Sequence, residues 1–252
     1  MSSLPLEGKV ALVTGASRGL GKAVALSLAR AGARLVLASR DVDSLKQTAD
    51  EISAAGTKAS VFKVDVTQEQ QILELEKKVA DECGRIHILV NNAGMNIRKP
   101  CTEFALDEWR QVLETNLTSA FLMCRAFVPL MKGQGYGRIL NMTSIMSHIA
   151  LPGRTAYCAS KAGLLGFTRA LALELAPDKI TVNGISPGPF ATEINTAVLQ
   201  NPELNQQFIS RIPLARWGNA DEVGNLAVYL CSESAGFITG TDLLIDGGWT
   251  AQ

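Results

Sequence analysis

The chain has 252 residues, of which 47% are hydrophobic and 19% are charged, a balance that is typical of a globular protein and excludes a mainly disordered chain. Lys plus Arg and Asp plus Glu number 24 each, so no overall field attracts nucleic acid or an anionic membrane. No apolar run approaches the roughly 20 residues that span a bilayer, and the N-terminal sequence lacks the pattern of a secretory leader.

Short apolar runs rich in β-branched residues alternate with helical patterns along the chain. We expect strands at residues 9–15, 34–39, 59–66, 85–94, 137–144, 180–188 and 241–248. The intervening segments 21–32, 42–56 and 68–84 have apolar residues at helical spacing and Gly near their C-terminal ends. This alternation predicts an α/β, doubly wound Rossmann fold, with a seven-stranded parallel sheet flanked by helices on both faces. No linker divides the chain, so we expect a single domain over 1–252, with ligands at the carboxyl ends of the strands.

A glycine-rich turn follows the first expected strand. Gly15, Gly19 and Gly21 form a GxxxGxG pattern between this strand and the first helix. Glycines at such a junction let backbone N–H groups and the helix N-terminus approach a pyrophosphate. The pattern therefore favours a dinucleotide site over the alternative of a merely tight turn.

The end of the second strand indicates which dinucleotide is bound. Many dinucleotide sites have an Asp or Glu there to hold the ribose 2′-hydroxyl of NAD, whereas this chain has Ser39 and Arg40. A guanidinium can pair with the 2′-phosphate of NADP, and Arg18 in the glycine turn can reach the same phosphate. We therefore expect NADP(H) to be favoured over NAD(H). The alternatives are that Asp41 turns into the site or that Arg40 points to solvent.

Polar residues also end the third and fourth strands. Asp65 either accepts a hydrogen bond from the adenine amino group or caps the following helix. Asn91, Asn92 and Gly94 are poor strand formers, so something other than sheet pairing selects them. Close approach to a ribose is one interpretation of this NNAG segment.

Tyr157 and Lys161 stand four residues apart at the start of a helical pattern. Residues at this spacing share one helix face, about 6 Å apart along the axis. An ammonium beside a phenol lowers a tyrosine pKa that is normally about 10, which yields a proton donor and acceptor near neutral pH. A YxxxK match also arises by chance. Ser144, at the end of the fifth strand, can donate a hydrogen bond to a substrate oxygen. Asn116 lies inside a long helical pattern, although Asn is a mediocre helix former.

Taken in order along the chain, these motifs resemble those of the short-chain dehydrogenase/reductase superfamily. The likeness extends over TGxxxGxG at 14–21, NNAG at 91–94, Asn116, Ser144, YxxxK at 157–161 and Pro187-Gly188. It implies that Tyr157 is the general acid and base, and that Lys161 binds the nicotinamide ribose and lowers the pKa of that tyrosine. It also implies that Ser144 orients the carbonyl and that Asn116 anchors a water-linked proton relay.

The same resemblance implies a cofactor surface that runs from the glycine turn to the segment 187–192 along the nicotinamide. The expected cofactor contacts are Gly15, Ser17, Arg18, Gly19, Leu20, Gly21, Ser39, Arg40, Asp65, Val66, Asn92, Ala93, Gly94, Tyr157, Lys161, Pro187, Gly188, Phe190 and Thr192.

The substrate is indicated by motifs that look like one branch of the family. The segments NNAGMNIRKP, PGPFATEI, RIPLARWG and LLIDGGW are similar to the branch of gluconate 5-dehydrogenases and deoxygluconate dehydrogenases, although acyl-thioester ketoreductases share much of this framework. Arg98 and Arg154 can pair with a sugar-acid carboxylate, and Met146 is a third expected substrate contact. The alternative is that both arginines are solvated loop charges.

We therefore expect an enzyme that interconverts a ketone and a secondary alcohol, on a keto or hydroxy sugar acid or a related small carbonyl compound. The runner-up is a 3-oxoacyl-thioester reductase that acts on acyl carrier protein or CoA thioesters, for which the sequence has no basic patch. A non-catalytic dinucleotide-sensing protein is the third hypothesis, although it has no need of the Asn/Ser/Tyr/Lys set.

Several pocket residues are ambiguous in the sequence. Residues 190–212 form either a mobile cover over the substrate or an ordinary packed helix pair. Met95, Ile97, Met123, His148 and Trp217 can line a pocket, although Met and aromatic residues lie more often in a core.

Cysteine usage and the family resemblance indicate the cellular setting. The five cysteines have neither a CxxC pair nor zinc-site spacing, which indicates reduced thiols in a cytoplasmic protein without a metal. The resemblance implies a homotetramer built on the helices around 103–131 and 157–176. The apolar run AGLLGFTRALALELA fits an interface between copies, and it fits packing on the sheet equally well.

Overall fold

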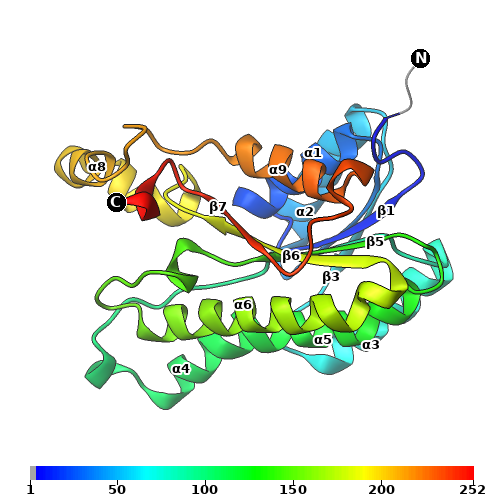
Figure 1. Ribbon diagram of the computed structural model, residues 1–252, viewed down its shortest axis with the longest axis horizontal. Helices are drawn as coiled ribbons and strands as arrows, with labels where there is room; N and C mark the ends of the chain where they lie inside the picture. Colours follow the sequence, from blue (N-terminus) through cyan, green and yellow to red (C-terminus); the bar gives the residue numbers. More distant parts are fainter. Residues whose placement is uncertain (1–3) are drawn as a thin grey trace.

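A single parallel sheet lies between two layers of helices in the computed structural model, which describes residues 4–252 apart from the side chains of Ile194 and Ala197 (Figure 1). The predicted domain starts at residue 1, and residues 1–3 lie outside the described residues. The strands are β1 (Val10–Thr14), β2 (Arg34–Ser39), β3 (Ala59–Lys63), β4 (Ile88–Asn91), β5 (Gly137–Met142), β6 (Ile180–Pro187) and β7 (Asp242–Ile245). Their order, β3-β2-β1-β4-β5-β6-β7, confirms the seven-stranded parallel sheet of the Rossmann fold.

Helices cover both faces of this sheet. They are α1 (Gly19–Arg30), α2 (Val42–Ala54), α3 (Glu69–Cys83), α4 (Leu106–Leu113), α5 (Ser119–Phe127), α6 (Thr155–Leu175), α7 (Thr196–Leu199), α8 (Pro202–Ile209) and α9 (Ala220–Cys231). Figure 1 shows α1, α2 and α9 on one face and α3, α4, α5 and α6 on the other. No helix within residues 4–252 is both long and apolar enough to cross a membrane.

The strands are buried on both faces, which explains their nearly continuous apolar runs. In β1, Ala11 and Val13 belong to the core under α1, α2 and α9, whereas Val10 and Leu12 face the core under α3, α5 and α6. The same alternation holds in β2, because successive side chains of a strand point to opposite faces.

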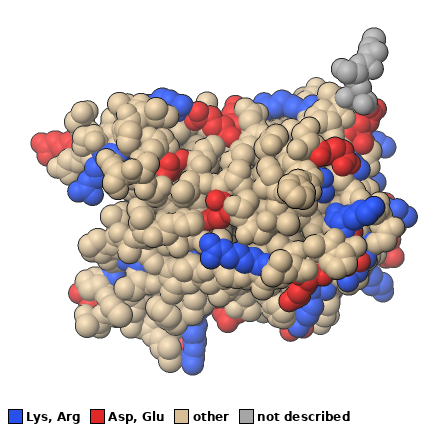
Figure 2. Space-filling model, viewed as in Figure 1, with Lys and Arg blue, Asp and Glu red and all other residues tan. Residues whose placement is uncertain are grey.

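The place of β1 in the sheet positions the site. β1 pairs with β2 on one side and with β4 on the other, so the connections that follow β1 and β4 lead to opposite faces. Ligands of open α/β sheets bind in the crevice that such a reversal creates. Figure 2 shows acidic and basic residues interspersed over one face of the molecule, in line with the balanced charge of the sequence.

Candidate active site

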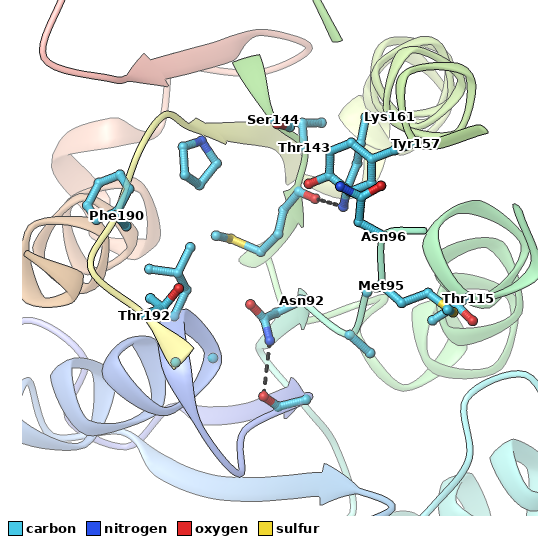
Figure 3. Close-up of a pocket in the computed structure, with 18 of the residues that line it drawn as sticks. Asn92, Met95, Asn96, Thr115, Thr143, Ser144, Tyr157, Lys161, Phe190 and Thr192 are labelled. Carbon is cyan, nitrogen blue, oxygen red and sulfur yellow. Dashed lines mark hydrogen bonds between the residues drawn. The ribbon is translucent and has the colours of Figure 1, made fainter. Parts of the chain in front are cut away.

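A cavity of about 340 Å³ lies at the carboxyl ends of the strands, and the glycine turn, the NNAG segment and the start of α6 all line it. Every residue predicted to contact the cofactor is part of the lining, and so are the three predicted substrate contacts, Arg98, Met146 and Arg154. Figure 3 shows Ser144, Tyr157 and Lys161 on one side of this cavity and Phe190 and Thr192 across from them. Asn116 is the one predicted site residue outside the lining.

The glycine turn forms a cradle that larger residues would fill. Gly15 and Gly19 have φ of +64° and +56°, a backbone region that residues with a side chain rarely adopt. A Cβ on Gly21 would lie 2.3 Å from the Gly15 carbonyl oxygen. The backbone N–H groups at the start of α1 therefore stay accessible, as the binding of a dinucleotide pyrophosphate requires.

Asn92 makes hydrogen bonds within the protein that its sequence position does not reveal. Its side-chain amide donates to the carbonyl oxygens of Thr14 (2.9 Å) and Gly15 (3.1 Å), while its backbone N–H donates to Thr14 Oγ1 (3.0 Å). Asn91 is buried, and its amide donates to Asn141 Oδ1 on the neighbouring strand (2.9 Å). The two asparagines thus fix the end of β4 to β1 and β5, and this bonding explains why poor strand formers occur there.

At the adenosine end, the cavity offers positive charge. Arg18 and Arg40 are exposed on its lining, and Ser39 Oγ donates to Ser17 Oγ at 3.2 Å. The Asp41 carboxylate instead caps α2, since it accepts from the Ser44 N–H (3.1 Å) and the Ser44 hydroxyl (2.8 Å). The hydrogen bonds from Ser44 hold the pKa of Asp41 below its usual value. Asp41 does not turn into the site.

The structure contradicts one of the two interpretations of Asp65, the helix cap. Its carboxylate accepts from the Thr67 N–H (3.0 Å) and hydroxyl (2.7 Å), which closes a short turn before α3. The residue at the N-cap of α3 is Gln68. Asp65 therefore does not cap the helix itself. It lines the cavity from this turn, where a contact with the adenine stays a prediction.

Tyr157 and Lys161 lie on the first turns of α6, and both face the cavity. Lys161 is buried, and its Nζ donates to the Met142 carbonyl oxygen at 2.5 Å. Burial lowers the pKa of this ammonium to about 8, although the negative charge of Asp242 partly opposes the shift. The Lys161 ammonium lies 5.7 Å from the centre of the Tyr157 ring.

The pKa of Tyr157 differs in direction from the expectation. Burial raises it above 10, and the hydrogen bond with Ser144 and the positive charges of Arg154 and Arg98 lower it only in part. The Lys161 ammonium, which donates to the Met142 carbonyl oxygen, does not offset this rise. Ser144 also caps a short 3₁₀ turn (Ile145–Ser147), where its Oγ accepts from the Met146 N–H at 3.1 Å.

Asn116 occupies a single π-helical turn (Glu114–Thr118) between α4 and α5, a local feature that is frequent at functional sites. Its side chain is buried, accepts from the Met95 N–H (2.8 Å), and donates to the Met95 carbonyl oxygen (2.9 Å) and Ser160 Oγ (2.9 Å). Asn116 thus holds the segment after NNAG against α6. Its role in a proton relay stays a prediction.

The substrate end of the cavity combines positive charge with an apolar wall. Arg98 and Arg154 make no salt bridge within residues 4–252, and they are close enough that the charge of Arg98 lowers the pKa of Arg154, after the larger effect of burial. Met146, Phe208 and Trp249 form the apolar side, and the Phe208 and Trp249 rings lie 5.7 Å apart.

The structure decides between the two interpretations of the ambiguous pocket residues, and it adds lining residues that the sequence did not indicate. Met95 lines the cavity as expected, but Met123 is in the core, and Trp217 stacks behind Phe208 at 5.4 Å. Ile97 and His148 do not belong to the lining. The missed residues include Asn96, whose buried Oδ1 has no hydrogen-bond partner in the described chain, and Phe208 and Trp249. Only the polarity of Asn96 in a strand-end loop could have drawn attention to it.

Residues 190–212 form the turns and helices around α7 and α8, and Phe190, Thr192, Glu193, Asn195 and Phe208 from this segment line the cavity. Within residues 4–252, no three His, Cys, Asp or Glu side chains gather closely enough to hold a metal ion.

Comparison with known proteins decides the family. The family model described as enoyl-(acyl carrier protein) reductase matches residues 15–250. The chain belongs to the short-chain dehydrogenase/reductase superfamily. It is 39% identical over 246 residues to a 3-oxoacyl-(acyl carrier protein) reductase of Aquifex aeolicus, with 97% of this chain and 98% of that protein covered. It is 36% identical over 247 residues to the gluconate 5-dehydrogenase of Gluconobacter oxydans, covering 98% of this chain and 96% of that protein.

Solved structures of this superfamily have the same fold. A gluconate 5-dehydrogenase of Burkholderia cenocepacia, in complex with NADP and tartrate, aligns with a TM-score of 0.94 at 33% identity and covers 99% of this chain and 98% of that one. Members of this family are dehydrogenases and reductases that act on CH–OH groups. This short-chain dehydrogenase/reductase is therefore an oxidoreductase of that class.

Proposed function

We propose that this short-chain dehydrogenase/reductase uses NADP(H) to interconvert a ketone and a secondary alcohol in a keto or hydroxy sugar acid. The observation that carries the proposal is a pair of guanidinium groups in the cavity that Tyr157 lines. Arg98 and Arg154 both belong to its lining, and neither has a carboxylate partner in the part of the chain that the structure describes. A planar carboxylate suits such a pair. The unpaired Oδ1 of Asn96 adds an acceptor for a substrate hydroxyl.

NADP(H) fits the charge at the adenosine end. Arg18 and Arg40 can neutralise a 2′-phosphate, while the carboxylate of Asp41, the residue after Arg40, is engaged by Ser44. The solved relative from Burkholderia contains NADP. Direct titration should give a lower dissociation constant for NADPH than for NADH, and the reverse order would contradict this preference.

The proposed chemistry follows from the residues around the cavity. When bound, the nicotinamide supplies or accepts a hydride. Ser144 and Tyr157 hold the substrate oxygen by hydrogen bonds that strengthen as that oxygen gains negative charge. Tyr157 gives its proton to this oxygen during reduction and takes it back during oxidation. The Lys161 ammonium, 5.7 Å from the centre of the Tyr157 ring, adds a positive charge that favours the phenolate that remains.

The substrate is tested by NADPH consumption with 5-ketogluconate and with an acetoacetyl thioester at equal concentrations. Fast turnover of the keto acid alone supports the proposal. Arg98→Ala should then raise the KM for the keto acid at least tenfold, because it removes a charge-assisted contact with the carboxylate. Arg85→Ala is the matched control, since Arg85 is exposed before β4, at the opposite edge of the sheet. Equal KM values for the two variants would refute carboxylate binding by Arg98.

Reduction of 3-oxoacyl thioesters is the second candidate, because the wall formed by Met146, Phe208 and Trp249 can pack against an acyl chain. Preference for the thioester in the same assay would establish it. The third hypothesis, a non-catalytic sensor, is set aside by membership of a family of oxidoreductases.

The assembly state is part of the same proposal. Leu106 on α4, Phe121 on α5 and Leu173 on α6 are exposed large apolar side chains, and Leu173 is 78% exposed. These helices can form the interfaces of a homotetramer, and sedimentation at a monomer mass would contradict it. All five cysteines are free, which supports a cytoplasmic location where thiols stay reduced.

A further inference from the structure

A buried carboxylate outside the cavity contacts both flanks of the turn that carries Ser144. Asp242 is the first residue of β7, and its side chain is only 2% exposed. Its Oδ1 lies 2.6 Å from Thr143 Oγ1, and its Oδ2 lies 2.6 Å from Ser186 Oγ and 2.7 Å from His148 Nε2. A Cβ on Gly184 of β6 would lie 2.2 Å from Oδ1. The fold therefore reserves this space for the carboxylate.

Two of these partners delimit the Ser144 turn. Thr143 directly precedes Ser144, and His148 ends the 3₁₀ turn that Ser144 caps. Ser147 in the same turn donates to the Lys161 carbonyl oxygen at 3.0 Å. Movement of the Asp242 carboxylate would thus displace both ends of the turn relative to Tyr157 on α6.

The charge of Asp242 also acts on Lys161. Of the charged groups around that buried ammonium, Asp242 is the one that raises its pKa, against the larger lowering by burial. Tyr157 is the other titratable group beside it, at 5.7 Å. Around the carboxylate itself, the facing groups are His148, Thr143 and Ser186.

We propose that Asp242 is a positioning residue, whose carboxylate fixes the Ser144 turn through Thr143 and His148 and places a negative charge near Lys161. The proposal rests on the catalytic roles proposed above for Ser144, Tyr157 and Lys161. Asp242 does not line the cavity, so it acts on the reaction only through these residues.

The test is Asp242→Asn, which keeps the shape of the side chain and removes its charge, with Asp178→Asn as the matched control. Asp178 forms an ion pair with Lys132 (2.9 Å) beyond the end of α6, at the opposite edge of the sheet. We expect Asp242→Asn to lower kcat at least tenfold, with the NADPH dissociation constant within about twofold of wild type. The fall of the reduction rate at alkaline pH should also begin at a lower pH, because Lys161 then loses its proton more easily. The control should change neither kcat nor this profile.

A second variant keeps the test valid if Asp242→Asn does not fold, as circular dichroism would show. His148→Ala removes one flank contact from a side chain that is 30% exposed, and it should lower kcat severalfold without weakening NADPH binding. The proposal would be overturned if folded Asp242→Asn had wild-type kcat and an unshifted pH profile. If only His148→Ala folds, wild-type kcat in that variant would overturn it. Tyr157→Phe in the same assay separates the two levels. Ordinary turnover by Tyr157→Phe would overturn the proposed catalytic roles as well. If Tyr157→Phe is inactive while Asp242→Asn has wild-type kcat, only the role of Asp242 is overturned.

Discussion

Replacing Gly21 with Ala should damage cofactor binding and stability together. The new Cβ would lie 2.2 Å from Asn92 Nδ2 and 2.3 Å from the Gly15 carbonyl oxygen. The Gly15 carbonyl belongs to the backbone of the glycine turn, so the turn must move by about 0.7 Å to reach 3.0 Å, the shortest separation that a Cβ tolerates. Overpacking of this kind costs about 1–3 kcal/mol, which lowers Tm by roughly 2–12 °C in a chain of this size.

The same displacement moves the N–H groups that we expect to bind the pyrophosphate. We therefore expect the NADPH dissociation constant of Gly21→Ala to rise at least tenfold, a loss of about 1.4 kcal/mol. Fluorescence titration measures the dissociation constant, and a thermal melt measures Tm.

Gly224→Ala is the matched control for crowding. A Cβ on Gly224 of α9 would lie 2.2 Å from Ser27 Oγ on α1, and this contact is outside the cavity lining. The control should lose a similar amount of stability while it keeps wild-type affinity for NADPH. If Gly21→Ala loses stability but binds NADPH as tightly as Gly224→Ala, the glycine turn does not bind the cofactor and the reasoning fails.

Three further predictions concern the chemistry. Tyr157→Phe should keep NADPH affinity and lose nearly all turnover, because the phenol proton has no substitute; ordinary turnover would contradict the assignment. In the wild type, the reduction rate should fall as the pH rises through about 8, because Lys161 then loses its proton and with it the positive charge that favours the phenolate. A rate that is flat up to pH 10 would argue against this role. Arg40→Ala should weaken NADPH binding about tenfold and leave NADH binding nearly unchanged, because only NADPH carries the 2′-phosphate. Equal losses for both cofactors would indicate a general effect on the site.

Local patterns in the sequence were sufficient for the strands and for the glycine turn, whereas most of the cavity lining was predicted from the resemblance to the superfamily. Strands buried on both faces have continuous apolar runs, a glycine-rich turn between a strand and a helix is typical of a phosphate-binding loop, and the i, i+4 spacing puts Tyr157 and Lys161 on one helix face. These features depend on neighbours within a few residues, which is why all seven strands and the grouping of the motifs at one sheet edge could be predicted.

Only the tertiary structure decided which side chains meet across the sheet. The amide of Asn92 bonds to Thr14 and Gly15, far away in the sequence, and Asp242 reaches Thr143 and His148 from the last strand. The raised pKa of Tyr157 likewise depends on burial by several elements. Strand order and crossovers bring these groups together, and a period of two or 3.6 residues along one segment carries no information about partners nearly a hundred residues away.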